Sequence, residues 1–232
     1  MRDKIIVLTH LGLGDMICCY SIVKAVLDSV AHTVIVPCKE KYVNSLKHLY
    51  SSETKIVLLS MAVPDNNIGS ELATVLNYGQ QNNVDIIQIG FNNIQNPFHY
   101  KHFFEQVSVP YQSSWERFPD FQSTPQSKQL YDSLENKDYA LVINTNSYGS
   151  YDLKIDTDLP QLKMYDANLG LGIFDWLDVI KNAKEIHSVG TGPFHLIDRI
   201  KKFNYNCKLY FHNVRQDYHT VDTHWDWTLI DY

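Results

Sequence analysis

The sequence predicts an α/β protein made of two halves, each built around its own parallel sheet. Short apolar runs with strand character alternate with stretches whose apolar residues recur at helical spacing. An aromatic and proline-rich segment, Pro97–Gln129, interrupts the alternation, which then starts again. Because alternating strands and helices form parallel sheets with right-handed crossovers, we expect two Rossmann-like domains that face each other across a cleft.

The first half contains strand and helix patterns in strict alternation. The expected strands are Lys4–Thr9, Thr33–Pro37, Lys55–Leu59 and Val84–Ile89, and the expected helices are Met16–Val30, Lys41–Tyr50 and Glu71–Asn83. The interrupting segment ends in a Ser, Gln, Thr and Pro stretch, Gln122–Ser127, which is typical of a linker. We therefore expect an N-terminal domain of residues 1–125 and a C-terminal domain of residues 126–232.

The second half repeats the alternation over a shorter length. The expected elements are a helix Lys128–Glu135, a strand Tyr139–Asn144, a helix Phe174–Asn182, a strand Glu185–Ser188, a helix Pro193–Phe203 and a strand Cys207–His212. The tail "HWDWTLIDY" is amphipathic. We interpret it as a helix that crosses back to the first domain, anchored by Trp225 and Trp227, or as a self-association surface.

Composition excludes several classes of protein. The 232 residues are 44% hydrophobic and carry a net charge of −6 without a long Lys/Arg stripe, which disfavours nucleic acid as a partner. No apolar stretch approaches the ~18 residues of a membrane-spanning helix, so we expect no transmembrane segment. Four cysteines without a C-x-x-C pair indicate reduced thiols and a cytoplasmic protein, and the ten histidines show no metal-binding spacing.

Two glycine-containing loops follow expected strands and precede expected helices. In the first, "HLGLGD", His10 is followed by Gly12, Gly14 and Asp15. Glycines between a strand and a helix usually make room for a phosphate, but a carboxylate at that place would repel one. In the second, Ser188 to Gly192 reads "SVGTG" and Pro193 is expected at the first position of the helix, so an anion could bind the helix N-terminus. Simple helix capping is the alternative there.

These two stretches, "HLGLGDMI" and "NAKEIHSVGTGPFHLIDRI", resemble the corresponding motifs of the heptosyltransferase-like families of GT-B-fold glycosyltransferases. The resemblance implies that the first domain binds the acceptor and the second the nucleotide-sugar donor. It also implies transfer of a sugar from a nucleotide-diphosphate sugar to an acceptor hydroxyl, with inversion and without a metal or other cofactor.

The resemblance assigns roles to individual residues. Asp15 would be the general base, and the alternative for this residue is a helix N-cap. The acceptor side would include His10, Gly12 and Gly14, and the aromatic tract Phe98–Phe121 would line an acceptor pocket or form core. The donor phosphates would meet Ser188, Gly190, Thr191, Gly192, Thr145, Asn146 and Ser147. His195 would face the donor or pack in the core, and Arg215 would neutralise phosphate charge if its loop folds back.

Two other functions remain open from the residues themselves. An NAD(P)-dependent Rossmann oxidoreductase is suggested by the incomplete G-x-G-x-x-G at Gly12 and Gly14, with Glu40 beyond the second strand as the ribose-binding acid. A non-catalytic module of the same fold that binds a nucleotide or a sugar is the other alternative. Asp15 argues against the oxidoreductase, because its charge would oppose a pyrophosphate.

Overall fold

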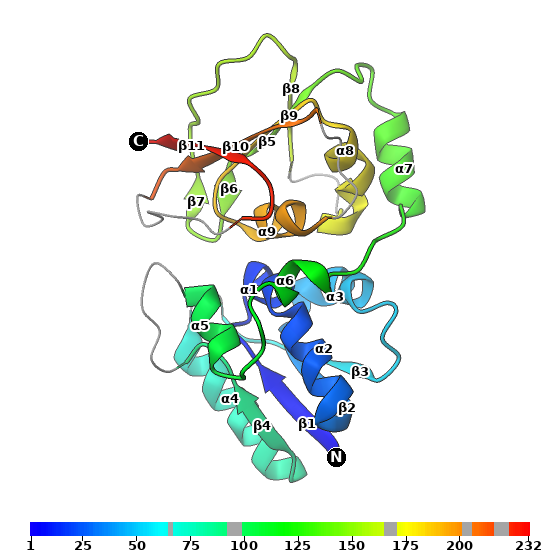
Figure 1. The fold of residues 1–232 in the computed structure, drawn as a ribbon, viewed down its shortest axis with the longest axis vertical. Helices are drawn as coiled ribbons and strands as arrows, with labels where there is room; N and C mark the ends of the chain where they lie inside the picture. Colours follow the sequence, from blue (N-terminus) through cyan, green and yellow to red (C-terminus); the bar gives the residue numbers. More distant parts are fainter. Residues whose placement is uncertain (65–66, 92–98, 165–170, 201–205, 216–222) are drawn as a thin grey trace. The chain divides into compact units, whose positions relative to one another are not determined.

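The computed structural model describes residues 1–64, 67–91, 99–164, 171–200, 206–215 and 223–232. The chain divides into two compact units, Met1–Phe118 and Pro119–Tyr232 (Figure 1). Each unit contains a parallel sheet with associated helices, so the predicted α/β class is confirmed. The division falls before Pro119 and not after residue 125.

Contacts of the residues after Pro119 explain where the division lies. The ring of Phe121 packs against Phe174 at a centroid distance of 4.8 Å, and the Phe121 carbonyl accepts a hydrogen bond of 2.9 Å from Lys181 Nζ. The Thr124 hydroxyl accepts from the Ser127 amide at 2.9 Å and so caps the first helix of the second unit. The expected linker is therefore an ordered part of the second unit.

The sheet of the first unit has the strand order β3-β2-β1-β4, and every neighbouring pair is parallel. The strands are β1 Arg2–Leu8, β2 Ala31–Lys39, β3 Ile56–Met61 and β4 Asp85–Gln88. Its helical segments are α1 Leu13–Cys18, α2 Tyr20–Ser29, η1 Glu40–Tyr42, α3 Val43–Leu49, α4 Ile68–Asn82, α5 His99–Glu105 and α6 Ser113–Glu116. The predicted helix Met16–Val30 is two helices, because Cys19, with ψ of 6°, leaves the helical conformation.

Helices cover both faces of the first sheet. Ile6 and Leu8 of β1 pack with Val75 of α4 in one apolar cluster. Because successive strand residues point to opposite faces, Ile5 and Val7 face the other side, where α2 lies (Figure 1). Part of the aromatic tract is core as well, since the side chains of Phe103, Phe104 and Phe118 are fully buried.

The sheet of the second unit has the order β11-β10-β9-β5-β8 and is also parallel throughout. Its strands are β5 Ala140–Ile143, β8 Gln161–Lys163, β9 Glu185–Ser188, β10 Lys208–Asn213 and β11 Trp227–Asp231, beside a small antiparallel hairpin of β6 Thr145–Asn146 and β7 Gly149–Ser150. Its helical segments are α7 Pro125–Asp132, η2 Ile173–Trp176, α8 Leu177–Asn182 and α9 Gly192–Arg199. The edge strand β8 and the hairpin were not expected from the sequence.

The C-terminal tail is a strand and not the expected helix returning to the first domain. β11 extends the second sheet by pairing with β10, from Leu209 opposite Trp227 to Asn213 opposite Asp231. The buried carboxylate of Asp198, in α9, holds the start of the tail. Its Oδ1 atom accepts from the amides of His224 and Trp225 at 2.9 and 3.4 Å and from the Trp227 indole at 3.2 Å.

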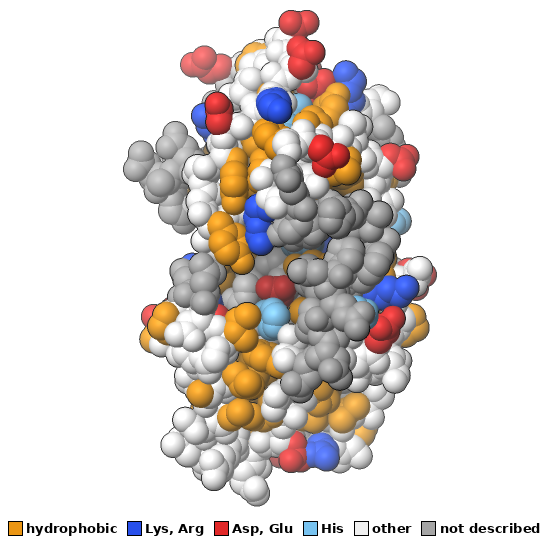
Figure 2. Space-filling model, turned by 90° about the vertical axis from the view of Figure 1, so that its left-hand side faces the viewer, with side chains coloured by type: hydrophobic (Ala, Val, Ile, Leu, Met, Phe, Trp, Pro, Cys, Tyr) orange, Lys and Arg blue, Asp and Glu red, His pale blue; other side chains and the backbone are white. Residues whose placement is uncertain are grey.

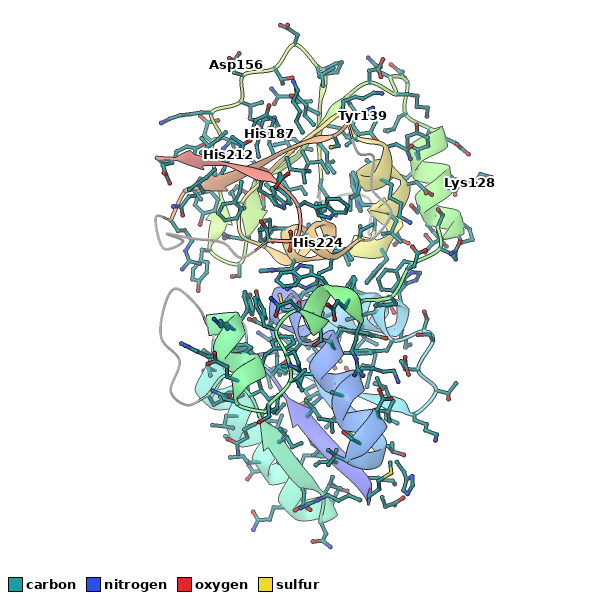
Figure 3. The ribbon with its side chains drawn as sticks, in the orientation of Figure 1. Lys128, Tyr139, Asp156, His187, His212 and His224 are labelled. Carbon is teal, nitrogen blue, oxygen red and sulfur yellow. The ribbon has the colours of Figure 1, made fainter. Side chains whose placement is uncertain are left out.

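One side of the second sheet carries a buried hydrogen-bonded chain of polar side chains (Figure 3). The amide of Lys154 donates to the Tyr232 hydroxyl at 2.7 Å, and that hydroxyl lies 2.9 Å from His212 Nδ1. His212 Nε2 lies 3.1 Å from His187 Nδ1, and His187 Nε2 lies 3.6 Å from Glu185 Oε2. With both imidazoles neutral and protonated at Nε2, Tyr232 donates to His212 and His212 donates to His187, while His187 Nε2 faces Glu185 at the longer distance of an ion-pair contact.

The same chain opposes protonation of its histidines. Burial lowers the pKa of His212 to about 4, with a further contribution from His187, and burial also lowers the pKa of His187 against the attraction of Glu185. A proton added to His187 Nδ1 would point at the proton on His212 Nε2. Lys208, which pairs with Glu185 at 3.1 Å, and Tyr210, which stacks on His187 at 4.5 Å, complete the surroundings.

On the face drawn in Figure 2, the Lys and Arg side chains are scattered among acidic ones. Within the described parts of the chain, no helix combines the length and the apolar character that crossing a membrane requires.

We predict that acid destabilises the second unit through His212. The histidine has a lower pKa in the folded protein than its ordinary value of 6.5, so the unfolded chain binds the proton more tightly. Stability is complete above pH 6.5 and falls as the pH decreases toward 4, by on the order of 3 kcal/mol for this group. Urea unfolding at several pH values should show a smaller decrease for His212→Phe, whereas the exposed-site variant His32→Gln should keep the wild-type decrease.

We also predict that Asp198 secures the C-terminal strand. Asp198→Ala leaves three partly buried amide and indole donors without their acceptor, so the free energy of unfolding should fall by about 3 kcal/mol. Asp198→Asn keeps one carbonyl oxygen and should lose less. The exposed Asp226→Ala serves as the control and should change stability by less than about 0.5 kcal/mol in urea unfolding. Equal losses in the Asp198→Ala and Asp226→Ala variants would contradict this role.

Candidate active site

The first glycine loop leaves the carboxyl end of β1, next to the carboxyl end of β4. In the strand order β3-β2-β1-β4, strands β2 and β3 are added on one side of β1. The chain then crosses over, and β4 is added on the other side of β1. Ligands of open parallel sheets bind at such a switch in strand order. The amide of Ile89, just after β4, donates to the Leu8 carbonyl at 2.8 Å and so joins the two strand exits. The loop with His10, Gly12 and Gly14 therefore lies where a ligand is expected.

Asp15 is the third residue of α1, and Gly12 is the residue at the helix N-cap. The alternative role of Asp15 as an N-cap is therefore wrong. A Cβ atom at position 12 would collide with Asp15 Oδ2, so the absence of a side chain at Gly12 makes room for the carboxylate. Gly14 is the second residue of the same helix. Gly12, which the sequence suggested would make room for a phosphate, makes room for the Asp15 carboxylate instead.

The carboxyl group of Asp15 binds its proton more tightly than an ordinary aspartate does. Burial raises its pKa from 3.8 to about 6, against the opposing effects of the His10 charge and of a hydrogen bond from Tyr100, while the charge of Glu71 raises it further. A carboxylate with such a pKa is ionised at neutral pH and still has a useful affinity for a proton. Asp15 is therefore suited chemically to act as a general base.

His10 is fixed by the chain that follows β4. Its Nε2 atom lies 2.6 Å from the Gly90 carbonyl oxygen, so Nε2 carries a proton and donates it. The rings of Phe91 and Phe103 contact it edge-on, with centroids 5.1 and 5.3 Å away. Gly90 has a φ of +87°, and a Cβ there would collide with the Phe103 ring. Gly90 could not be identified from the sequence, because its requirement for glycine follows from the positive φ angle of the folded chain.

Two further charged residues of this site were also missed. Lys39 ends β2 and Glu71 lies in the first turn of α4, and both are almost completely buried. Lys39 Nζ contacts Glu71 Oε1 at 2.7 Å, and Glu71 Oε2 accepts from the Leu11 amide at 3.3 Å. The available signal was positional: a lysine at the carboxyl end of a strand and an acid in the first turn of a later helix.

The candidate donor residues of the second unit surround the carboxyl ends of β5 and β9. These neighbouring strands flank the switch in the order β11-β10-β9-β5-β8. Thr145 and Asn146 form β6, and Ser147 is exposed at the following turn. Asn146 Nδ2 donates to the Gly190 carbonyl at 3.3 Å, which joins the hairpin to the loop after β9. The structure thus brings together two segments that are more than forty residues apart.

The loop after β9 has a different geometry from the one expected. Ser188 is fully buried, and its hydroxyl donates to the Val189 carbonyl at 2.9 Å, so it points into the fold. Thr191 is the N-cap residue of α9, Gly192 is the first residue of the helix and Pro193 the second. Because helices leave their first amides unpaired and proline has none, the amides of Gly192 and Phe194 are the available donors.

His195 and Arg215 differ in their surroundings. His195 is buried within α9 against the Phe194 ring, at 5.0 Å between centroids, which agrees with the packing alternative. Arg215 follows β10 and is exposed, and its guanidinium carbon lies 4.1 Å from the centre of the Tyr148 ring. Arg215 therefore lies against the hairpin that carries Thr145 and Asn146.

Comparison with protein-family models gives no match, and comparison with curated proteins gives none either. Among solved structures, the chain is similar to the crystal structure of the glycosyl transferase family 9 from Veillonella parvula DSM 2008, with a TM-score of 0.53. The similarity covers 99% of this chain and 87% of that one, at 9% sequence identity. At this identity the similarity shows the fold alone: the chain has the α/β fold, with parallel sheets, of a glycosyl transferase structure.

Proposed function

We propose that the chain is a glycosyltransferase that moves a sugar from a nucleotide-diphosphate sugar to an acceptor hydroxyl. The observation that carries the proposal is Asp15, a partly buried carboxylate with a pKa of about 6, for which Gly12 makes room. It lies at the switch in strand order of a sheet whose fold is shared with a glycosyl transferase structure. An acid at this place opposes a phosphate and favours a substrate hydroxyl.

In the proposed reaction Asp15 accepts the proton of the acceptor hydroxyl. The hydroxyl oxygen forms a bond to the anomeric carbon while the bond from that carbon to the diphosphate breaks. Attack opposite the leaving group inverts the anomeric centre. The electron pair leaves with the nucleoside diphosphate, so Asp15 gains a proton and the diphosphate gains a negative charge. His10 lies on the acceptor side with Gly12 and Gly14.

The second unit supplies groups suited to the diphosphate. The unpaired amides at the start of α9 and the Thr191 hydroxyl can donate hydrogen bonds to its oxygens. Asn146 and Gly190 border the same strand ends, and Arg215 brings a positive charge against Tyr148. These groups offset the charge of the leaving diphosphate by hydrogen bonds and a guanidinium, which supports transfer without a metal ion.

The oxidoreductase alternative is less compatible with this geometry. A dinucleotide would place its pyrophosphate at the start of α1, where the Asp15 carboxylate occupies the space beside Gly12. The binding-module alternative makes the same donor contacts and lacks only the transfer. Turnover therefore distinguishes the module from the enzyme, while stabilisation by NAD(H) in place of a nucleoside diphosphate would support the oxidoreductase.

We predict that Asp15→Asn lowers turnover by about 10²- to 10⁴-fold, because the amide cannot accept the hydroxyl proton. Nucleoside diphosphate binding should persist, since the donor groups are in the second unit. For the wild type, kcat/KM should rise with pH through about 6, as the base ionises. Release of nucleoside diphosphate from a panel of nucleotide sugars measures both effects. Unchanged turnover in Asp15→Asn would exclude Asp15 as the base.

We predict that Arg215→Ala weakens binding of a nucleoside diphosphate by roughly tenfold, because a charge-assisted hydrogen bond to phosphate is lost. Calorimetric titration with UDP, GDP and ADP measures the change. Lys163→Ala removes one exposed positive charge from the end of β8 in the same unit and is the matched control. If both variants lose the same affinity, the effect of Arg215 is one of overall charge and its place in the donor site is wrong.

A further inference from the structure

A buried ion pair lies next to the loop that carries Asp15. Lys39, at the end of β2, and Glu71, in α4, have exposed fractions of 6% and 3%. Their side chains meet at 2.7 Å between Lys39 Nζ and Glu71 Oε1. Removing two charges from water costs several kcal/mol per ion, and a buried pair often adds little net stability compared with apolar residues. The pair therefore calls for a role other than stability.

Glu71 connects the ion pair to the loop that carries Asp15. Its second oxygen, Oε2, accepts a hydrogen bond of 3.3 Å from the amide of Leu11. Leu11 is fully buried and directly precedes Gly12, the residue that makes room for Asp15. One carboxylate thus joins the end of β2, the start of α4 and the loop after β1. The position of the loop depends on the orientation of Glu71, and Lys39 fixes that orientation.

Glu71 also acts on Asp15 through its charge. The groups that face Asp15 are His10 from its own loop, Tyr100 from α5 and Glu71 from α4. Of these, only Glu71 opposes ionisation of Asp15, and Lys39 lies beyond Glu71 as its partner. Because Lys39 and the Leu11 amide hold the two oxygens of Glu71, the Glu71 carboxylate has a fixed place beside the Asp15 loop.

We propose that Lys39 and Glu71 are a positioning pair, which holds the Asp15 loop through the Leu11 amide and maintains a negative charge beside the base. Neither residue touches the substrate in this role. The inference deepens the proposed function, on which it rests, by adding residues that act through Asp15. A base that keeps a high affinity for its proton is better able to take one from a hydroxyl.

Titration of the Asp15 carboxyl group by carbon-13 NMR tests the charge effect in the full chain, without any substrate. In Glu71→Gln the pKa of Asp15 should fall below the wild-type value, because a negative charge is lost and Glu71 no longer offsets the positive charge of Lys39. In the charge-free double variant Lys39→Met/Glu71→Gln it should fall by less. The control Glu40→Gln removes an exposed acid next to Lys39 and should leave the pKa of Asp15 unchanged. An unchanged pKa in the Glu71 variants would overturn the proposal.

Hydrogen exchange of the Leu11 amide tests the hold on the loop. The matched pair is Lys39→Met/Glu71→Gln, which keeps an acceptor, and Lys39→Met/Glu71→Leu, which removes it. Exchange of the Leu11 amide should be roughly fivefold faster in the leucine variant, the effect of losing one hydrogen bond. Equal exchange rates would overturn the positioning role. These double variants carry no unpaired buried charge, so the test does not depend on the stability of Glu71→Gln.

Failure of this inference differs from failure of the proposed function. If the chain bound no nucleoside diphosphate and transferred no sugar, the glycosyltransferase proposal would fail while the Asp15 titration could still respond to Glu71. If sugar transfer required Asp15 but the pKa of Asp15 did not change in the Glu71 variants, only the proposal of a positioning pair would fail. In an active enzyme, the pH at which kcat/KM rises should shift downward in Lys39→Met/Glu71→Gln, whereas a purely structural pair would change the rate without moving the pH profile.

Discussion

The parallel arrangement of strands is the constraint on which both candidate sites depend. Every strand of a parallel sheet ends at the same edge, so loops from distant parts of the chain meet there. In the first unit this edge collects the loop of Asp15 after β1, Lys39 at the end of β2 and Gly90 after β4. In the second unit it collects Asn146 and Gly190. Neither set of residues is contiguous in sequence.

The two sheets use charge in different ways. The first unit encloses a lysine and two acids around a loop, and burial, with a further contribution from the charge of Glu71, raises the pKa of Asp15. The second unit contains a hydrogen-bonded chain of two imidazoles and a hydroxyl, from His187 to Tyr232, which links three neighbouring strands. The first arrangement is suited to proton transfer. The second consists of hydrogen bonds between neutral groups and is suited to holding the sheet at neutral pH.

Local patterns were sufficient to predict most strands and the class of the fold. Strand β5 lies within the apolar run Tyr139–Asn144 that predicted it, because a fully buried strand is marked by its own residues. The tail was misread because Trp225 and Trp227 suggest an amphipathic helix, whereas capture by Asp198 and pairing with β10 are long-range contacts. The break at Cys19 was missed because helical spacing of apolar residues continues across it.

The sequence was sufficient to predict the glycine loops of the candidate site, but not the buried charged residues that lie beside the first of them. Asp15 and the glycines around it stand together in one hexapeptide, which made them visible. Lys39 and Glu71 are 32 positions apart, and each resembles an ordinary surface charge until the fold buries the two together. Ser188 illustrates the opposite error. Its hydroxyl was expected to bind phosphate, but it points into the fold and donates to the Val189 carbonyl.

The raised pKa of Asp15 has a thermodynamic consequence for the whole chain. A carboxyl group whose pKa is about 6 when folded and near 4 when unfolded opposes folding increasingly as the pH rises above 4, and fully once the pH exceeds about 6. At neutral pH this opposition is on the order of 2 kcal/mol, a sizeable part of the net stability of a typical domain. The first unit is thus less stable than its packing alone would make it, and the penalty is concentrated in the residue best suited to remove a proton from a substrate.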